Sequence, residues 1–161
     1  QVPLIEAERI EAQIKFADGR KSVLSPPVLN DFLFANTNPA HTCRYRVALG
    51  AESALHRSSG IWISSAVGSS AAINSAGGVI QPHGSHNFQF RVRELYLSSP
   101  SVRILEGALF NPEATPLNIR SYCENAILAL DGQHQLYQIS YGDSIEFARA
   151  SKLKLAHQPT L

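Results

Sequence analysis

Hydrophobic and polar residues alternate along much of the chain, and this pattern predicts short β-strands. In residues 10–16 the apolar side chains of Ile10, Ala12, Ile14 and Phe16 alternate with polar ones, as in a strand that buries one face. The same alternation, or a short β-branched and aromatic run, predicts further strands over residues 22–24, 28–34, 44–49, 61–63, 88–92, 102–105, 117–122, 126–130, 134–139, 144–148 and 153–156.

Clusters of Gly, Pro, Asn and Ser separate these segments, and two of them are hairpin signals. Asp18-Gly19 and Asp131-Gly132 each stand between two predicted strands, as Asp-Gly does in tight hairpin turns. A short helix is expected after residue 63, ending at Gly77-Gly78, because glycine commonly follows the last helical residue. Many short strands with one short helix predict a mainly β protein, a β-sandwich, with no domain boundary within residues 1–161.

The segment 61–78 carries most of the functional information. An apolar strand (Ile61 to Ile63) gives way to serine, alanine and glycine. Small side chains let a ligand approach the backbone, and hydroxyls and free N–H groups supply polar contacts. This chemistry suits the sugar or phosphate of a nucleotide, although neither common phosphate-loop spacing is present. The alternative is a tightly packed corner between strand and helix that binds no ligand.

A second candidate lies in the apolar run 28–34, which contains Asn30 and Asp31. Polar side chains in a buried strand are costly unless they are hydrogen-bonded. The pair can donate to and accept from a ribose diol. The alternative is a bulge at a sheet edge with both side chains in solvent.

Composition narrows the class of protein. The chain has 161 residues, with 14 basic and 13 acidic side chains and a net charge of +1, so a nucleic-acid-binding face is not expected. No apolar run approaches the roughly 20 residues of a membrane span. Cys43 and Cys123 are expected to be a reduced pair in an intracellular protein, and the histidines predict no metal site. The absence of Met leads us to expect a domain of a longer chain.

Four motifs, in order over residues 29–147, resemble the NAD kinase family. Residues 63–78 resemble its signature I-S-T-P-T-G-S-T-A-Y-x-x-S-A-G-G, and Leu29-Asn30-Asp31 stands in place of L-N-E/D. Residues 86–91 resemble H-S-L-S-F-R, and residues 130–133 and 141–146 resemble the D-G-Q and G-D-x-I pair. Ala72, in place of the signature's Tyr, makes the chain most similar to the plant-type NADH kinase branch.

The resemblance implies the C-terminal, substrate-binding β-sandwich domain of a two-domain kinase. Such a kinase phosphorylates the adenosine ribose 2′-hydroxyl of NAD or NADH with ATP to give NADP(H). The implied substrate-binding residues are Asn30 and Asp31 at a ribose, Gly68 and Ser69 at a close approach, Ser70 and Ala71 at the adenine, and Ser75 on the same helix face at the second ribose. No residue of this chain is assigned to catalysis.

The family's G-G-D-G-T motif, which supplies the base and holds ATP, is absent from these residues. ATP and a divalent metal such as Mg²⁺ are therefore expected to bind through an N-terminal catalytic domain, without which this chain is inactive. The resemblance also implies a homo-oligomer formed through the sandwich domain. The cytoplasm is the expected compartment, with mitochondria or another organelle as alternatives.

Three departures from the family pattern keep a second function open. Val67 replaces a hydroxyl residue, Ala72 replaces an aromatic one, and Ser59 stands where many members have Asp. The alternative is a catalytically degenerate binding or assembly module with the same fold.

Overall fold

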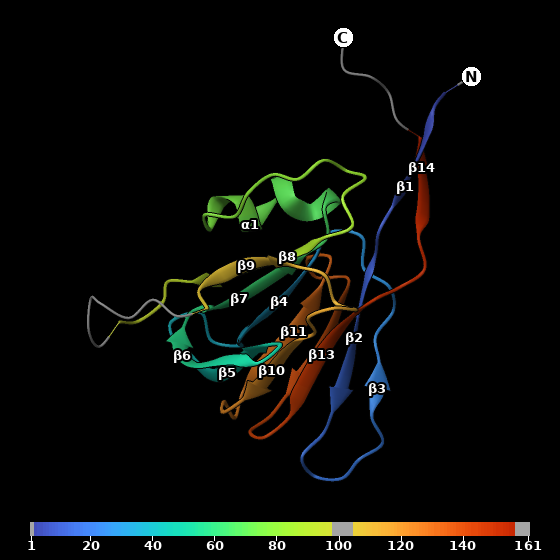
Figure 1. The fold of residues 1–161 in the computed structure, drawn as a ribbon. Helices are drawn as coiled ribbons and strands as arrows, with labels where there is room; N and C mark the ends of the chain where they lie inside the picture. The colour runs from blue at the N-terminus through green and yellow to red at the C-terminus, as the bar shows by residue number, and fades with distance from the viewer. Residues whose placement is uncertain (1, 98–104, 157–161) are drawn as a thin grey trace.

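Two six-stranded antiparallel sheets pack face to face in the computed structural model, which describes residues 2–97 and 105–156 (Figure 1). The first sheet has the order β3-β2-β13-β10-β5-β6. Its strands are β2 (Ile10–Lys15), β3 (Val23–Leu24), β5 (Cys43–Leu49), β6 (Glu52–Ser58), β10 (Leu117–Ser121) and β13 (Ser144–Arg149). The predicted β-sandwich is confirmed.

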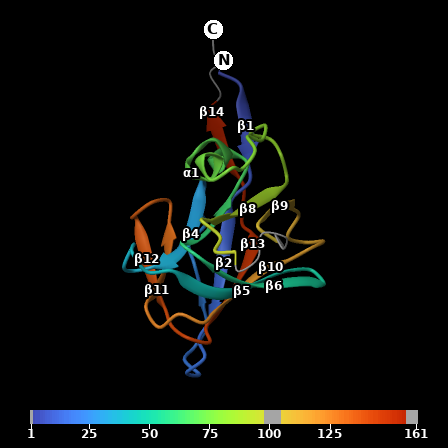
Figure 2. The same cartoon turned by 90° about the vertical axis from the view of Figure 1, so that its left-hand side faces the viewer.

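The second sheet has the order β12-β11-β4-β7-β8-β9. Its strands are β4 (Asp31–Asn36), β7 (Gly60–Ser64), β8 (Phe88–Arg93), β9 (Gly107–Phe110), β11 (Ala126–Leu130) and β12 (Gln135–Ile139). A separate two-stranded ribbon joins β1 (Leu4–Ala7) to β14 (Leu153–Ala156). Figures 1 and 2 show this ribbon at the same end of the sandwich as the helical segment.

The core lies between the two sheets and is filled by the inward residues of each alternating strand. Phe34 of β4 meets Tyr45 of β5 edge to face, with 5.4 Å between ring centroids. The buried Tyr45 hydroxyl lies 2.7 Å from Ser58 Oγ and 3.2 Å from the carbonyl oxygen of Gly60. These bonds satisfy a polar group that would otherwise be costly to bury.

The sequence pattern predicts most strands, with differences at the sheet edges. Strands β1, β6 and β9 are not predicted by it; β6 and β9 are edge strands and β1 belongs to the separate ribbon, and none of the three shows a regular alternation of buried and exposed residues along its length. The strand expected over residues 28–34 begins only at Asp31, with Val28 in an isolated bridge. The strand expected over 102–105 lies mainly outside the described residues.

The short helix is confirmed, and its end is the glycine pair. A 3₁₀ turn, η1 (Val67–Ser70), precedes α1 (Ala72–Ser75). Gly77 has φ +90°, and its N–H donates to the Asn74 carbonyl at 3.0 Å, while the Gly78 N–H donates to the Ile73 carbonyl at 2.9 Å. This is the Schellman arrangement, in which a left-handed residue closes the helix.

Cys43 and Cys123 are free and buried. In the described part of the chain, no helix is long and apolar enough to cross a membrane. Residues 2–97 and 105–156 also contain no group of three or more His, Cys, Asp or Glu side chains placed to hold a metal ion.

Candidate functional site

Asp131, at the turn between β11 and β12, fixes the loop that carries Asn30 and Asp31. Its Oδ1 accepts the backbone N–H groups of Asn30 at 2.8 Å and Asp31 at 3.3 Å, and its Oδ2 accepts that of Leu29 at 3.2 Å. The Asp131 N–H donates to the Asp31 carbonyl at 3.0 Å. In residues 29–31 the backbone N–H groups therefore bind one carboxylate rather than a neighbouring strand, and β4 begins at Asp31 instead of at residue 28.

Asp31 is buried, with 7% of its surface exposed. Among the described residues no group donates a hydrogen bond to its carboxylate. Burial, and secondarily the negative charge of Asp131, raises the pKa of Asp31 to about 6. When ionised, this carboxylate is a strong hydrogen-bond acceptor for which the described residues supply no donor.

Ser64 stands directly opposite Asp31 in the pairing of β4 with β7. Its Oγ is buried and has no hydrogen-bond partner. Two neighbouring strands thus place a buried, unpaired hydroxyl opposite a carboxylate that lines a pocket and accepts no hydrogen bond from the described residues. A buried hydroxyl in a native protein rarely lacks a partner. Ser64 belongs to the signature segment, but the sequence gives no reason to select it among the serines there.

Asp31 also lines a pocket of about 350 Å³ on the outer face of the second sheet. The apolar wall includes Leu33, Trp62, Ile127 and Leu136, and Gly132 and Gln133 form the end nearest the β11–β12 turn. Small-molecule sites commonly combine such apolar walls with a few polar groups that set orientation.

Gly68 brings the two predicted motifs together. A Cβ at this position would lie 2.1 Å from the carbonyl oxygen of Asn30. The same carbonyl accepts the Ser65 N–H at 3.0 Å, and Ser65 Oγ donates to the Leu29 carbonyl. Gly68 is thus packed closely against the protein's own backbone, and the close approach of a ligand at this residue stays a prediction.

The other predicted residues divide into one buried and four exposed. Ser69 is buried, and its Oγ donates to the Ala66 carbonyl at 2.6 Å and accepts the Gln81 N–H at 2.8 Å, so its hydroxyl is engaged within the fold. Ser70, Ala71 and Ser75 are exposed, as is Asn30. Their contacts with a ligand remain predictions.

The expectation that Ser75 shares one helix face with Ser70 and Ala71 is wrong. At Ala71 the backbone leaves the helical region, with φ −85° and ψ −146°. This break separates η1 from the single turn of α1, so the two serines belong to different elements.

No protein-family model matches the chain. A probable NADH kinase of rice (Oryza sativa subsp. japonica) is 32% identical over 126 residues, covering 74% of this chain and 38% of the relative. The NADH kinase of Arabidopsis thaliana is 36% identical over 92 residues, covering 57% of this chain and 28% of the relative. The chain belongs to the NAD kinase family.

The fold agrees with this assignment. A crystal structure of yeast NADH kinase complexed with NADH superposes with a TM-score of 0.78 at 20% identity, covering 93% of this chain and 42% of that one. The NAD kinase chain described here therefore spans well under half the length of the relatives it matches.

In this NAD kinase chain, β8 holds the helical segment against the second sheet. The Gln89 amide binds both backbone groups of Val79, at 2.8 and 2.9 Å. Arg91 Nε donates to the Ala76 carbonyl at 3.1 Å, and its guanidinium lies 3.6 Å from Glu106. The alternation along the strand predicts a solvated face for Arg91; instead it binds the end of α1, a long-range contact that periodicity does not show.

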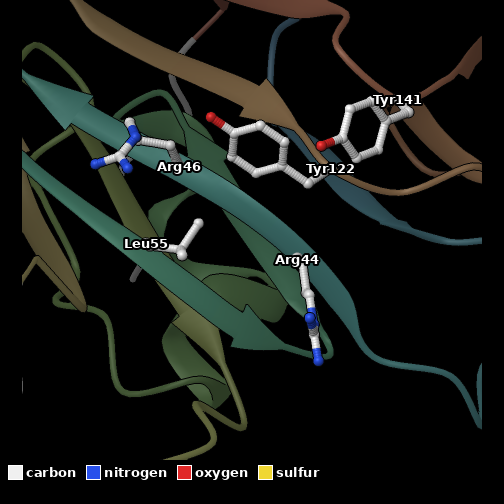
Figure 3. Close-up of a pocket in the computed structure, with 5 residues that line it drawn as sticks. All are labelled: Arg44, Arg46, Leu55, Tyr122 and Tyr141. Atoms are coloured by element: carbon white, nitrogen blue, oxygen red, sulfur yellow. The ribbon is translucent and has the colours of Figure 1, made fainter.

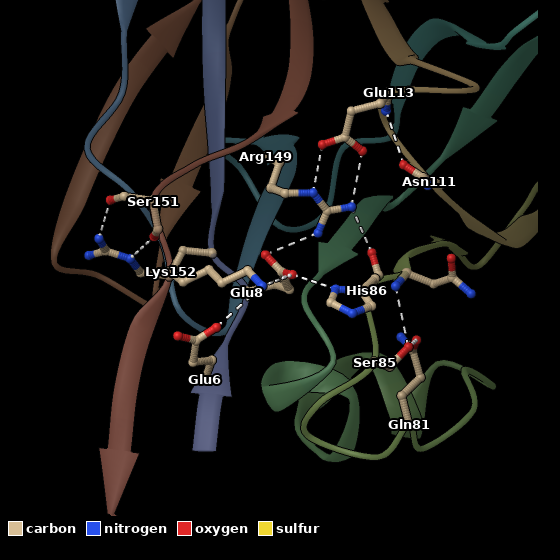
Figure 4. A network of polar contacts seen from close by, with 12 residues as sticks. Glu6, Glu8, Gln81, Ser85, His86, Asn111, Glu113, Arg149, Ser151 and Lys152 are labelled. Carbon is tan, nitrogen blue, oxygen red and sulfur yellow. Dashed lines mark hydrogen bonds and ion pairs between the residues drawn. The ribbon is translucent and has the colours of Figure 1, made fainter. Parts of the chain in front are cut away.

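A buried carboxylate ties the segment after β1 to the loop before β8 (Figure 4). The side chain of Glu8 is 2% exposed and lies 2.6 Å from His86 Nδ1, 3.1 Å from Arg149 and 3.4 Å from Lys152. Arg149 also binds both oxygens of Glu113, at 2.6 and 3.1 Å. Burial acts to raise the pKa of Glu8, but hydrogen bonds from His86 and Arg149 outweigh it and lower that pKa.

We expect Glu8→Gln to lower the free energy of unfolding by about 2 kcal/mol at pH 7, because it leaves Arg149 and Lys152 without a buried counter-charge. A group whose pKa is lowered by folding stabilises the protein above its ordinary pKa. The difference should therefore disappear as the pH falls below the ordinary value of 4.5. Urea unfolding measures it, with the exposed Glu6→Gln as control; equal losses in both variants would contradict a special role for Glu8.

Proposed function

We propose that residues 1–161 form the C-terminal, dinucleotide-binding domain of an NAD kinase. The whole enzyme would transfer a phosphoryl group from ATP to the adenosine ribose 2′-hydroxyl of NAD or NADH, giving NADP(H). Membership of the family and the names of the plant relatives support this proposal. The chain covers 38% of the rice relative, so the activity of the whole protein is inferred here from the part that this chain represents.

One observation carries the proposal: the unpaired carboxylate of Asp31 opposite the unpaired hydroxyl of Ser64. A ribose diol offers two O–H donors, and a carboxylate accepts two hydrogen bonds. The sugar would therefore satisfy Asp31, while the apolar wall formed by Leu33 and Trp62 offers contact area to a ring system.

The role of this domain would be orientation. Phosphoryl transfer depends mainly on positioning and on electrostatic stabilisation of the transferred group. Asp31, held in place by Asp131, would fix the sugar so that its reacting hydroxyl faces the phosphate donor. ATP and Mg²⁺ would be held by an N-terminal domain of the same protein.

We further propose that the sandwich domain associates with a second copy through the outer face of the second sheet. A second pocket there, of about 270 Å³, shares Leu33 and Ile127 with the pocket at Asp31. Leu136 is 53% exposed on the same face, and contiguous exposed apolar surface is typical of protein interfaces. Two free, buried cysteines suit the reducing intracellular compartment that we propose for the protein.

Calorimetric titration of the chain with NADH and with NAD tests the proposed dinucleotide site. Replacing both Asn30 and Asp31 by Ala should weaken binding at least tenfold, because a charge-assisted pair of hydrogen bonds is lost. Asp18→Ala, in the exposed hairpin after β2, is the matched control. Equal affinity in the wild type and the double variant would refute the assignment of the site.

A further inference from the structure

The outer face of the first sheet carries two directly opposed pairs of arginines. Arg44 of β5 stands opposite Arg57 of β6, and Arg46 of β5 stands opposite Arg120 of β10. All four side chains are exposed, and we call this set the arginine face. Like charges directly opposite one another destabilise a sheet, so the arrangement costs stability unless an anion lies against it.

No carboxylate of residues 2–97 and 105–156 supplies that anion. Among the described residues, none of the four arginines forms an ion pair with a carboxylate. Arg57 donates to Thr42 Oγ1 at 3.0 Å and lies 5.1 Å from the ring centroid of Tyr96. Because the whole chain has a net charge of only +1, the arginine face is a local concentration of charge rather than a reflection of composition.

Aromatic side chains lie beside these charges. A shallow pocket of about 330 Å³ is lined by Arg44, Arg46, Leu55, Tyr122 and Tyr141. The centroids of the two tyrosine rings are 5.5 Å apart, and Tyr141 is 57% exposed. Figure 3 shows the two rings next to each other along one side of β5, with Arg46 near the ring of Tyr122 and Leu55 on the other side of β5, on β6.

We propose that this surface binds a nucleoside polyphosphate. Guanidinium groups bind phosphate oxygens in a planar, two-pronged geometry. Within the part of the chain that the structure describes, the four guanidinium groups of the arginine face have no carboxylate partner. Aromatic side chains stack on nucleobases of any identity. Tyr122 and Tyr141 supply such rings next to Arg44 and Arg46, and Leu55 adds apolar contact area. A second copy of the same face is a poor occupant because it would bring like charges together.

This site is separate from the proposed dinucleotide site. Asp31 lies on the outer face of the second sheet, whereas the arginine face is the outer face of the first, so the core of the sandwich lies between them. The proposal goes beyond the kinase function and does not depend on it.

Titration of the chain with ATP in magnesium-free, low-salt buffer tests the proposal. Arg46→Gln combined with Arg120→Gln should weaken ATP binding at least tenfold, because two charge-assisted contacts are lost. The matched control, Lys15→Gln with Arg20→Gln, removes the same charge from the β2–β3 hairpin and should leave the affinity unchanged. Tripolyphosphate should bind more weakly than ATP, since it has no base to stack.

The outcomes separate this site from the dinucleotide site. ATP binding that persists in Asp31→Ala and in excess NADH supports a second site, whether or not NADH binds. Loss of ATP binding in Asp31→Ala would overturn the proposal. So would an equal loss of affinity in the test variant (Arg46→Gln with Arg120→Gln) and in the control (Lys15→Gln with Arg20→Gln). So would binding of a single-stranded oligoribonucleotide without binding of ATP, which would make the face a nucleic-acid surface.

Discussion

Asp31→Asn should raise the free energy of unfolding by about 3 kcal/mol at pH 7 and at the same time weaken dinucleotide binding. Burial and the nearby charge of Asp131 raise the pKa of Asp31 from its ordinary value of 3.8 to about 6. The folded chain therefore binds this proton more tightly than the unfolded chain does. An asparagine of nearly the same shape carries no charge to desolvate, and a shift of about two pKa units corresponds to about 3 kcal/mol.

The pH dependence of stability checks this reasoning. For the wild type the contribution of Asp31 to stability is most favourable below pH 3.8, declines as the pH rises to about 6, and is constant above that. Urea unfolding of both chains between pH 3.5 and 7.5 should show the gain of Asp31→Asn growing through this range. Asp18→Asn, on the exposed hairpin, should give no comparable gain. A variant no more stable than the wild type at pH 7 would contradict the burial of an uncompensated charge.

Gly68→Ala is expected to have the second largest effect, and here stability and binding fall together. The new Cβ would lie 2.1 Å from the carbonyl oxygen of Asn30, inside the 3.0 Å that real Cβ atoms essentially never cross. The obstacle is backbone, so either η1 or the loop before β4 must move. We expect a loss of about 3 kcal/mol in the free energy of unfolding and at least a tenfold loss in NADH affinity.

Gly84→Ala is the matched control for this variant, since an added Cβ there meets nothing within 4 Å. Gly84 lies in the loop that follows the same helical segment, and its replacement should leave both unfolding and titration curves unchanged. If Gly68→Ala also leaves NADH affinity unchanged, the contact between η1 and the Asn30 loop does not shape the site.

Local patterns in the sequence predict the β-sandwich, both hairpin turns and the glycine-terminated helix, because each depends on neighbours within a few residues. They also select the two segments that meet at Gly68. They do not show that Asp131, about a hundred residues away along the chain, holds the Asn30 loop, since this contact exists only once the sheet is formed. In the sequence, the hairpin turn at Asp131-Gly132 already accounts for an aspartate at this position, so nothing indicates a second role.

The serines illustrate the same limit. Ser64, Ser65, Ser69 and Ser70 look equivalent in the sequence, yet the fold buries the first three and exposes the fourth. Their hydrogen bonds also differ, and among these four only the hydroxyl of Ser64 is both buried and unpartnered. The opposed arginines on β5, β6 and β10 likewise become visible only when the register of three strands is known.

The position of Asp131 at the tip of a hairpin has a consequence for the protein's local unfolding. Strand β12 is the edge of its sheet, and edge hairpins can open at lower free energy than the whole domain. Opening this hairpin would remove the acceptor for the backbone N–H groups of Leu29, Asn30 and Asp31 together. These three amides should therefore exchange their hydrogens as one cooperative unit with the hairpin. A ligand at Asp31 would then slow hydrogen exchange at a turn about a hundred residues away along the chain.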